Sequence, residues 1–436
     1  MIYEIANKAK RAVENECDSY EIYIDESKLI ELDSKQDELN FAKEEIEQGV
    51  GIRVIKDNKV GFAFTSNLEK IAETGMQAIE NTKLNKKDEN YAFAEVEKVS
   101  DVKKVYDKKF NDLDLNESVE FLKNVITTAT DSGCEVTGSG FSASEGRSLI
   151  LNSNGVSIED EGTGFGVSLS VTIQEDGKIA TAYNSQASRF FDLDGEKLAN
   201  EVCNLAKSSL DTKPIETNDY DVVLDYYAAT GLLQTFISAF NGENVMRGRS
   251  ILNGKIGSEI ANPTLSIIDN PLLEKGMYTA KCDGEGSASQ KTDLIKDGVL
   301  NSFIYDIYTA NKAGLKTTSN GYRGSYLTTP MINPTNLEFK FSEMKDLDEI
   351  NNGVLTTSVL GAHTANPISG DFSVEASNAF KIENGELTDP INKAMISGNI
   401  FEIMKKVEGL NSEIKQYGPY IIPKLLVHDL RVVGQN

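Results

Sequence analysis

The residues best suited to chemistry lie in one short segment near the C-terminus. Between Gly361 and Ser373 the chain carries His363, Asn366, Pro367, Ser369 and Asp371. Small and polar residues around a proline predict a tight loop, in which these side chains meet one another or face a ligand. The alternative is a purely structural loop, whose polar side chains form hydrogen bonds with the backbone. The sequence leaves both interpretations open.

The scarcity of histidine limits mechanism more than any other feature. His363 and His428 are the only two histidines, and neither belongs to an HExxH zinc motif. A GxxxxGK[ST] phosphate loop and a GxSxG serine elbow are missing as well. Asp and Glu number 68, too many for a catalytic pair to be chosen from sequence. Arg323 faces either a substrate carboxylate or a structural acid, and we favour the structural acid.

Composition restricts the class of protein further. The 436 residues predict two or three domains, each with a core of its own. Lys and Arg number 44 against 68 acids, so the formal charge is −24, and the acidic excess is spread along the chain. Direct binding to nucleic-acid phosphate needs clustered basic residues and is therefore disfavoured. Hydrophobic residues at 39% and charged residues at 26% exclude wholesale disorder.

The cysteines and the N-terminus indicate a compartment. The four cysteines lie far apart and form no CxxC pair, which predicts reduced thiols in a reducing compartment; they are Cys17, Cys134, Cys203 and Cys282. The first residues include Lys8, Lys10 and Arg11 and never reach the apolar region of a secretory signal. No run approaches 18 apolar residues. We expect a cytoplasmic protein without membrane contact.

The first half of the chain predicts a repeated helix-sheet-helix unit. A helix from Ile2 to Val13 precedes a strand at Tyr20 to Ile24, and a hairpin then turns at Asp57-Asn58. After a lysine-rich stretch, a helix from Glu117 to Ala129 precedes a second hairpin, which turns at Asp176-Gly177. Each hairpin is followed by an amphipathic helix. An internal duplication over residues 1–210 is our hypothesis, and chance similarity is the alternative.

The second half predicts a different architecture. Residues 211–218 interrupt helical periodicity at Lys213-Pro214 and are expected to form a linker. In residues 219–436 we expect a helix from Ala228 to Phe240, a helix from Asn392 to Val407, and many short strands between turns. The predicted fold class is therefore α+β, with an N-terminal helix-sheet domain and a C-terminal, mainly antiparallel sheet or barrel.

The segment from His363 to Ser373 resembles the corresponding stretch of the TldD/PmbA proteins, in particular their PmbA (TldE) branch. The similarity continues through Asp283 to Gly286, Gln290 to Leu300, Asn320 to Tyr326 and Leu425 to Val427. It covers essentially the whole second domain and, more loosely, the first. Within this similarity, the segment from His363 to Ser373 is the motif most specific to the family, and the other segments support it.

This resemblance implies a two-subunit cytoplasmic metalloprotease. The TldD-type chain of that family carries zinc on a helical HExxxH motif with a cysteine near the C-terminus, and the PmbA-type chain is its partner. Here Gln234 and Ala239 occupy the two ligand positions, and Thr235 occupies that of the general base. An amide and a methyl group cannot replace two imidazoles, and a hydroxyl cannot take a proton from bound water as a carboxylate does. No cysteine follows Cys282.

The resemblance therefore implies a non-catalytic subunit without a cofactor of its own. Zinc is expected in a TldD-type partner, with which this chain would form a heterodimer that acts on a peptide substrate. Family members are linked to the trimming of peptide precursors and of unfolded antitoxin-like chains. Older descriptions call them modulators of DNA gyrase, although the acidic charge argues against DNA contact. An exposed sheet edge would allow a peptide to bind as an added strand.

Two alternatives stay open. The chain could be an autonomous hydrolase, using His363 with Asp371 and Ser369 or a metal held by carboxylates. It could also be a homodimeric peptide-binding or scaffold protein with no protease partner. Whether this chain is an enzyme is therefore undecided from its sequence.

Overall fold

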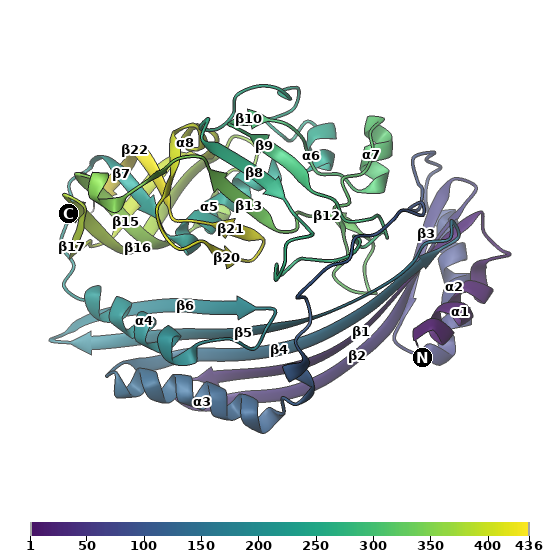
Figure 1. Cartoon of the computed structure of the whole chain (residues 1–436), viewed down its shortest axis with the longest axis horizontal. Coiled ribbons are helices and arrows are strands. Elements are labelled where there is room, and N and C mark those ends of the chain that lie inside the picture. The colour runs from purple at the N-terminus through teal and green to yellow at the C-terminus, as the bar shows by residue number, and fades with distance from the viewer. Residues whose placement is uncertain (1, 435–436) are drawn as a thin grey trace.

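The first half of the chain forms one long, curved sheet with helices on a single face (Figure 1). The computed structural model describes residues 2–434. In chain order the elements are α1 (Ile2–Val13), β1 (Ser19–Lys35), β2 (Glu38–Lys56), β3 (Lys59–Thr65), α2 (Ile71–Asn81), α3 (Leu115–Asp131), β4 (Glu135–Asn152), β5 (Ser157–Glu175), β6 (Lys178–Ser188) and α4 (Gly195–Ser208). Short 3₁₀ turns at Leu68–Lys70, Thr82–Leu84 and Lys108–Asn111 join them.

The order of strands in this sheet agrees with the predicted repeat. The order is β3-β2-β1-β4-β5-β6, so two three-stranded units meet at the antiparallel pair β1–β4. Each unit runs helix, three strands, helix along the chain. The two equivalent hairpin turns share a backbone conformation as well, with positive φ at Asp57, Asn58, Asp176 and Gly177. Positive φ at both central residues gives a turn whose twist matches that of the strands.

Apolar and small or polar side chains alternate along the strands, and this alternation decides which face of the sheet is buried. In β5 the apolar side chains of Phe165, Val167, Leu169 and Val171 pack beneath α3 and α4. In β1 and β2, Ile22, Ile24, Val50 and Ile52 pack beneath α1 and α2 in the same way. The residues between these point to the opposite face, toward the C-terminal domain (Figure 1).

The second half forms two large sheets and a small two-stranded sheet, with most of its buried apolar residues in one large core. Its first elements are β7 (Asn218–Leu224), α5 (Tyr226–Ser238), α6 (Gly242–Met246), β8 (Leu265–Asp269), β9 (Thr292–Lys296), β10 (Val299–Leu300), α7 (Ile307–Ala313), β11 (Gly321–Tyr322) and β12 (Met331–Ile332). These are followed by β13 (Leu337–Phe341), β14 (Met344–Lys345), β15 (Asn352–Leu360), β16 (Asp371–Glu383), β17 (Glu386–Pro390), β18 (Ala394–Asn399), α8 (Ile400–Lys406), β19 (Val407–Leu410), β20 (Lys415–Tyr417), β21 (Tyr420–Ile422) and β22 (Leu425–Gly434).

One of these sheets closes on itself. Strand β7 pairs with β15 in parallel and with β22 in antiparallel, so β7, β15, β16, β18 and β22 form a ring. The other large sheet has the order β10-β9-β8-β13-β21-β20 and leaves β20 at an edge, and β11 and β12 form the two-stranded sheet. Most pairings are antiparallel. The α+β fold class is confirmed, with a helix-sheet domain followed by a β-rich domain.

The predicted helix over Asn392 to Val407 is wrong in its first half. Residues Ala394–Asn399 form β18 between β16 and β22, where Ile396 lies opposite Val374 and Val432. Only Ile400–Lys406 is helical, and the Asn399 side chain caps it by accepting from the Phe401 and Glu402 N–H groups. The spacing of Ile396 and Ile400 suits a helix, but pairing with two distant strands prevails over that local pattern.

Residues 211–218 connect the two domains, and this segment lies against the β-rich domain. The Lys213 N–H donates to the Pro390 carbonyl at 2.7 Å, and β7 already begins at Asn218. Within residues 2–434, no helix combines the length and the apolar character that a membrane crossing needs.

Candidate functional site

The boundary between the two domains contains a chain of cavities. The largest, of about 900 Å³, lies against α5. It shares Tyr183, Tyr227 and Tyr417 with a neighbouring cavity of about 620 Å³. It shares Tyr278, Tyr322, Asn333 and Pro334 with another of about 540 Å³. These adjacent cavities are together called the cleft below.

Helix α5 forms one wall of this cleft. It begins at Asp225, whose carboxylate accepts from the Tyr226 N–H, and it buries Leu232, Leu233 and Phe236 in the core of the β-rich domain. Its other face carries Tyr227, Thr230, Gly231, Gln234 and Ser238, which recur at helical spacing and line the largest cavity. This helix is the one that the resemblance assigns to the zinc motif.

The zinc-ligand positions of that motif do not fit a metal. Gln234 is exposed in the cleft, whereas Ala239 is 1% exposed and caps the helix in the core. The Ala239 carbonyl accepts from Ser250 Oγ at 2.6 Å, and the Thr235 carbonyl accepts from Ser238 Oγ at 2.7 Å. In residues 2–434 no cluster of three or more His, Cys, Asp or Glu side chains is arranged to hold a metal ion.

Three tyrosines from distant parts of the chain meet across the cleft. The ring centroids of Tyr227 in α5 and Tyr417 in β20 lie 4.7 Å apart, and those of Tyr227 and Tyr183 in β6 lie 5.6 Å apart. Ser185 in β6 also bonds to the Tyr227 hydroxyl. Burial raises the pKa of Tyr227, so its hydroxyl stays protonated and can donate. The Tyr417 hydroxyl donates to the Asn184 side chain at 3.3 Å, and the edge-to-face rings offer apolar surface that suits the binding of a polypeptide.

Two sheet edges border these tyrosines. Strand β6 is the last strand of the N-terminal sheet, and β20 is the last strand of the second sheet. The Thr181 carbonyl accepts from the Asn378 side chain at 2.8 Å rather than from β5. Because main-chain groups alternate along a strand, the N–H and C=O of Tyr183 also point away from β5, toward the cleft.

The floor of the cleft consists of very small residues. The side of β4 and β5 that faces the β-rich domain is rich in glycine and serine, of which Ser144, Gly146, Ser148, Gly162 and Gly164 line the cavity of about 540 Å³ and Ser170 lines that of about 620 Å³. The opposite side of the same strands is apolar and buried. Such a floor leaves space above the sheet and brings the backbone close to whatever occupies the cleft.

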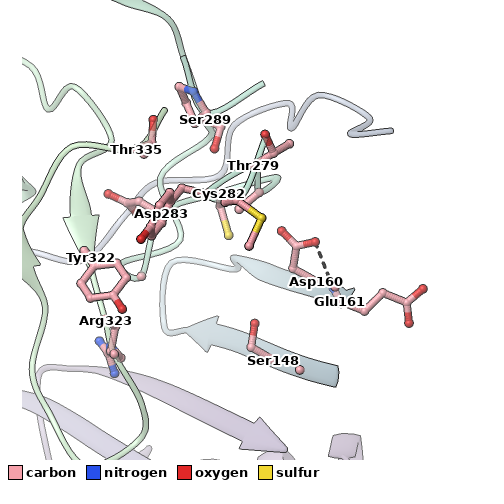
Figure 2. Close-up of a pocket in the computed structure, with 18 of the residues that line it drawn as sticks. Ser148, Asp160, Glu161, Thr279, Cys282, Asp283, Ser289, Tyr322, Arg323 and Thr335 are labelled. Carbon is pink, nitrogen blue, oxygen red and sulfur yellow. Dashed lines mark hydrogen bonds between the residues drawn. The ribbon is translucent and has the colours of Figure 1, made fainter. Parts of the chain in front are cut away.

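Buried charges hold the two domains together beside the smaller cavity. Arg53 Nη2 lies 2.8 Å from Glu21 and 3.3 Å from Glu285 of the other domain, and Arg323 pairs with Glu21. Burial raises the pKa of Glu285 to about 8, against the lowering effect of Arg53. The structure thus pairs Arg323 with an acid of this chain. Figure 2 shows Arg323 beside Tyr322 at the wall of the cavity.

Cys282 and Asp283 lie on the same wall (Figure 2). Burial raises the pKa of the Cys282 thiol well above its usual value, so it stays protonated and is a poor nucleophile and metal ligand. The Asp283 carboxylate accepts from the N–H groups of Glu285, Ser287 and Gly321, which satisfies both of its oxygens. The surroundings of Cys282 and Asp283 therefore indicate a structural role for both residues.

The loop from His363 to Asp371 is held by its own side chains. Ser369 Oγ donates to Asp371 at 2.7 Å, and the Asn366 side chain accepts from the Ile368 and Ser369 N–H groups. The Asn399 amide donates to the Ser369 carbonyl and to Asp371, and these side-chain bonds lower the pKa of Asp371. Pro367 and His363 are exposed, and in residues 2–434 His363 forms no hydrogen bond.

The structure therefore brings together only part of the predicted set. Ser369, Asp371 and Asn366 are connected by hydrogen bonds in one loop, while Arg323 lies at the domain boundary. A peptide-binding role for the loop stays a prediction. Sequence reasoning missed the tyrosines at 183, 227 and 417, which no local pattern links. The one available signal was the adjacent pair Tyr226-Tyr227 at the start of a helix whose other residues are mostly apolar.

The sequence and the fold of this two-domain protein match one class of known proteins. Three domain models match in succession: PmbA/TldA metallopeptidase domain 1 over residues 20–81, the central domain over 108–210 and the C-terminal domain over 217–434. The boundary between the first two models falls between the two repeats of the N-terminal sheet.

Similarity to individual proteins leads to the same family. The chain is 37% identical to the uncharacterized protein MJ0231 of Methanocaldococcus jannaschii, over 94% of this chain and 93% of that one. A crystal structure of TldE from Thermococcus kodakarensis superposes with a TM-score of 0.93 at 25% identity, covering 99% and 100% of the two chains. A structure from Thermotoga maritima, described as a candidate modulator of a DNA gyrase, has a TM-score of 0.91 at 26% identity, with coverage of 99% and 100%.

The chain belongs to the TldD/PmbA family of metalloprotease-like proteins, in its PmbA (TldE) branch.

Proposed function

We propose that this chain is the non-catalytic subunit of a two-chain peptidase, whose zinc is carried by a TldD-type partner. The observation that carries the proposal is the pair of residues at the ligand positions of α5. Gln234 offers a neutral amide, and Ala239 offers a methyl group that is enclosed in the core. Imidazole nitrogens, thiolates and carboxylates are the side chains that bind zinc in proteins.

The role of this chain is then to hold the peptide. An extended peptide adds a strand to an exposed sheet edge and forms main-chain hydrogen bonds that do not depend on its sequence. Strand β6 offers the free main-chain groups of Tyr183, and β20 borders the same cleft from the opposite domain. The tyrosine rings supply apolar contact on either side. Substrates of this kind are peptide precursors and unfolded polypeptides.

The charge of the chain supports a peptide rather than a nucleic acid as the ligand. A net charge of −24 repels phosphate, and binding to DNA requires neutralisation of phosphates by Lys and Arg. The proposal includes a cytoplasmic location, in keeping with the four free cysteines.

The test is co-expression of the full chain with a TldD-type protein. We expect a stable heterodimer that cleaves an unstructured peptide, and we expect cleavage to disappear when the HExxxH motif of the partner is mutated. Gln234→Ala in this chain should leave the zinc content of the heterodimer unchanged, because no zinc depends on it. Cleavage by this chain purified alone, together with stoichiometric zinc in elemental analysis, would favour the autonomous hydrolase and contradict the proposal. A lone dimer that binds no TldD-type protein would contradict it as well.

A further inference from the structure

The smallest cavity of the cleft, of about 540 Å³, lies next to the cavity that borders α5. It adjoins the largest cavity, and Tyr278, Tyr322 and Asn333 line both. Its floor is formed by β1, β4 and β5, and its roof by loops of the β-rich domain (Figure 2). A peptide held beside α5 can therefore extend into it.

The positive charges of this cavity already have partners. Arg323 pairs with Glu21, and Arg147 donates through Nε to Glu159 at 2.6 Å. Arg189 donates to the carbonyls of Gly276, Thr279 and Thr163 at 3.1–3.2 Å. Arg323 Nε and Nη1 form no hydrogen bond in the described chain, but both atoms are buried, so neither is accessible to a carboxylate of the ligand.

The Asp25 carboxylate, unlike these arginines, has no partner of opposite charge in the described chain. It lies on the floor in register between Gly49 of β2, over which the ring of Tyr326 packs, and Ser148 of β4, which lines the same cavity. In residues 2–434 its carboxylate forms neither a hydrogen bond nor an ion pair. Burial, and then the charges of Glu47 and Glu26, raise its pKa to about 6. The carboxylate is thus ionised at neutral pH without a compensating cation.

Asp160, another acid on the floor of this cavity, has hydrogen-bond partners for its carboxylate. It lies opposite Ser148 on the next strand, so that Asp25, Ser148 and Asp160 form one row across the sheet. Its carboxylate accepts from the N–H groups of Lys281 at 2.6 Å and of Glu161 at 3.0 Å. Within this row, Asp25 alone retains both oxygens for a ligand.

We propose that this cavity binds an alkylammonium group of the peptide, either its free amino terminus or a lysine side chain, through Asp25. The inference rests on the proposed function, because it assumes that the cleft holds a peptide. An ammonium group placed at Asp25 supplies the missing cation and forms charge-assisted hydrogen bonds, which are stronger than neutral ones. The tyrosines at the entrance can accommodate the chain that follows.

The experiment measures binding of labelled peptides to the full chain by fluorescence anisotropy. The probe is an unstructured decapeptide of Gly, Ser, Ala and Val with fluorescein at its C-terminus, prepared with a free and with an acetylated amino terminus. We expect the free form to bind at least about tenfold more tightly. A third peptide, acetylated but with lysine at position two, distinguishes the sources: tight binding identifies the side chain as sufficient, and weak binding identifies the amino terminus.

Variants assign the effect to its residue. Asp25→Asn keeps the shape but removes the charge, so it should bind free and acetylated peptides equally. Glu31→Gln, on the same strand but outside the cavity, should keep the preference of the native chain. Equal binding of free and acetylated peptides by the native chain, or a preference that survives in Asp25→Asn, would overturn the inference. Absence of binding by every peptide would instead overturn the peptide-holding role proposed above.

Discussion

Glu21 in β1 and Arg323 after β11 form an ion pair across the domain boundary, with side chains 0% and 1% exposed. Arg53 joins the same carboxylate from β2. Two buried atoms of Arg323, Nε and Nη1, have no hydrogen-bond partner in the described chain. The guanidinium therefore depends on Glu21 and on the ring of Tyr23, 4.7 Å away, for its stabilisation.

Glu21→Gln should destabilise the protein strongly, because it leaves the buried Arg323 without a carboxylate. Removing one partner of a buried pair costs about 3–5 kcal/mol of unfolding free energy, measured by equilibrium urea unfolding. Glu159→Gln is the matched control, since its partner Arg147 is 45% exposed and such pairs contribute at most about 1 kcal/mol. Equal losses for the two variants would show that the boundary pair has no special role.

His428 in β22 gives a pH-dependent prediction. Its Nδ1 and Nε2 each lie 2.9 Å from a carboxylate, of Asp221 in β7 and of Glu408 in β19. Burial alone would lower its pKa, but the bonds to Glu408 and Asp221 prevail and raise it. A raised pKa in the folded state stabilises the protein fully below the ordinary histidine pKa of about 6.5, and this stabilisation is lost as pH rises through the folded value.

His428→Gln should therefore lower stability at pH 5.5 and have a smaller effect at pH 8.5. Urea unfolding at both values measures the difference, which solvent screening keeps modest because the side chain is 39% exposed. His363→Gln, an exposed histidine without hydrogen bonds in the described chain, should leave the pH dependence unchanged. An unchanged pH dependence in His428→Gln would refute the assignment.

Local patterns allowed the N-terminal half to be predicted better than the C-terminal half. The repeat was visible because each unit is contiguous and ends in a turn at Asp57-Asn58 or Asp176-Gly177, where residues that tolerate positive φ are required. The Asn392 to Val407 segment failed because Ile396 belongs to a strand whose partners, Val374 and Val432, come from separate parts of the sequence. Short strands of this kind owe their identity to pairing rather than to their own residues.

The candidate site likewise has a part that could be predicted from the sequence and a part that could not. The positions of Gln234 and Ala239 on α5 were predicted from the family resemblance, whose HExxxH motif lies within one short segment. The contacts of the cleft were not predictable, since Tyr183, Tyr227 and Tyr417 come from β6, α5 and β20. Asp25 is one of 68 acids, and only the fold shows that it lacks a partner.

The edge of β6 can be tested separately from its side chains. Tyr183→Pro removes a main-chain N–H that points into the cleft and leaves the ladder to β5 intact, so we expect a stable protein that has lost most of its peptide affinity. Tyr183→Val removes the ring but keeps the N–H, and it should retain part of the affinity. Fluorescence anisotropy measures binding, and thermal unfolding checks the fold.

The control for this experiment lies one residue away. The Ala182 N–H points toward β5, so Ala182→Pro should break a ladder bond and lower the unfolding temperature clearly more than Tyr183→Pro. If Tyr183→Pro bound peptide as the native chain does, strand addition at β6 would be excluded as the mode of binding.

The motif positions on α5 give the last prediction, in which a zinc motif is rebuilt. In the variant Gln234→His, Thr235→Glu, Ala239→His, the first imidazole would lie in the open cleft, but the second would have to occupy the core beside Phe236 and Phe240. Ala239→His adds volume and a polar ring at a site that is 1% exposed, which should cost about 2–4 kcal/mol. The single variant Gln234→His should cost almost nothing.

We therefore expect the triple variant to be destabilised in urea unfolding and still to contain well under one zinc per chain by elemental analysis. A third ligand is missing as well, because Cys282 lies in another cavity, where burial keeps its thiol protonated. Stoichiometric zinc in a stable triple variant would show that only the side chains, and not the surrounding packing, separate this chain from a metal-binding one. The core around Ala239 would then be no barrier to catalysis.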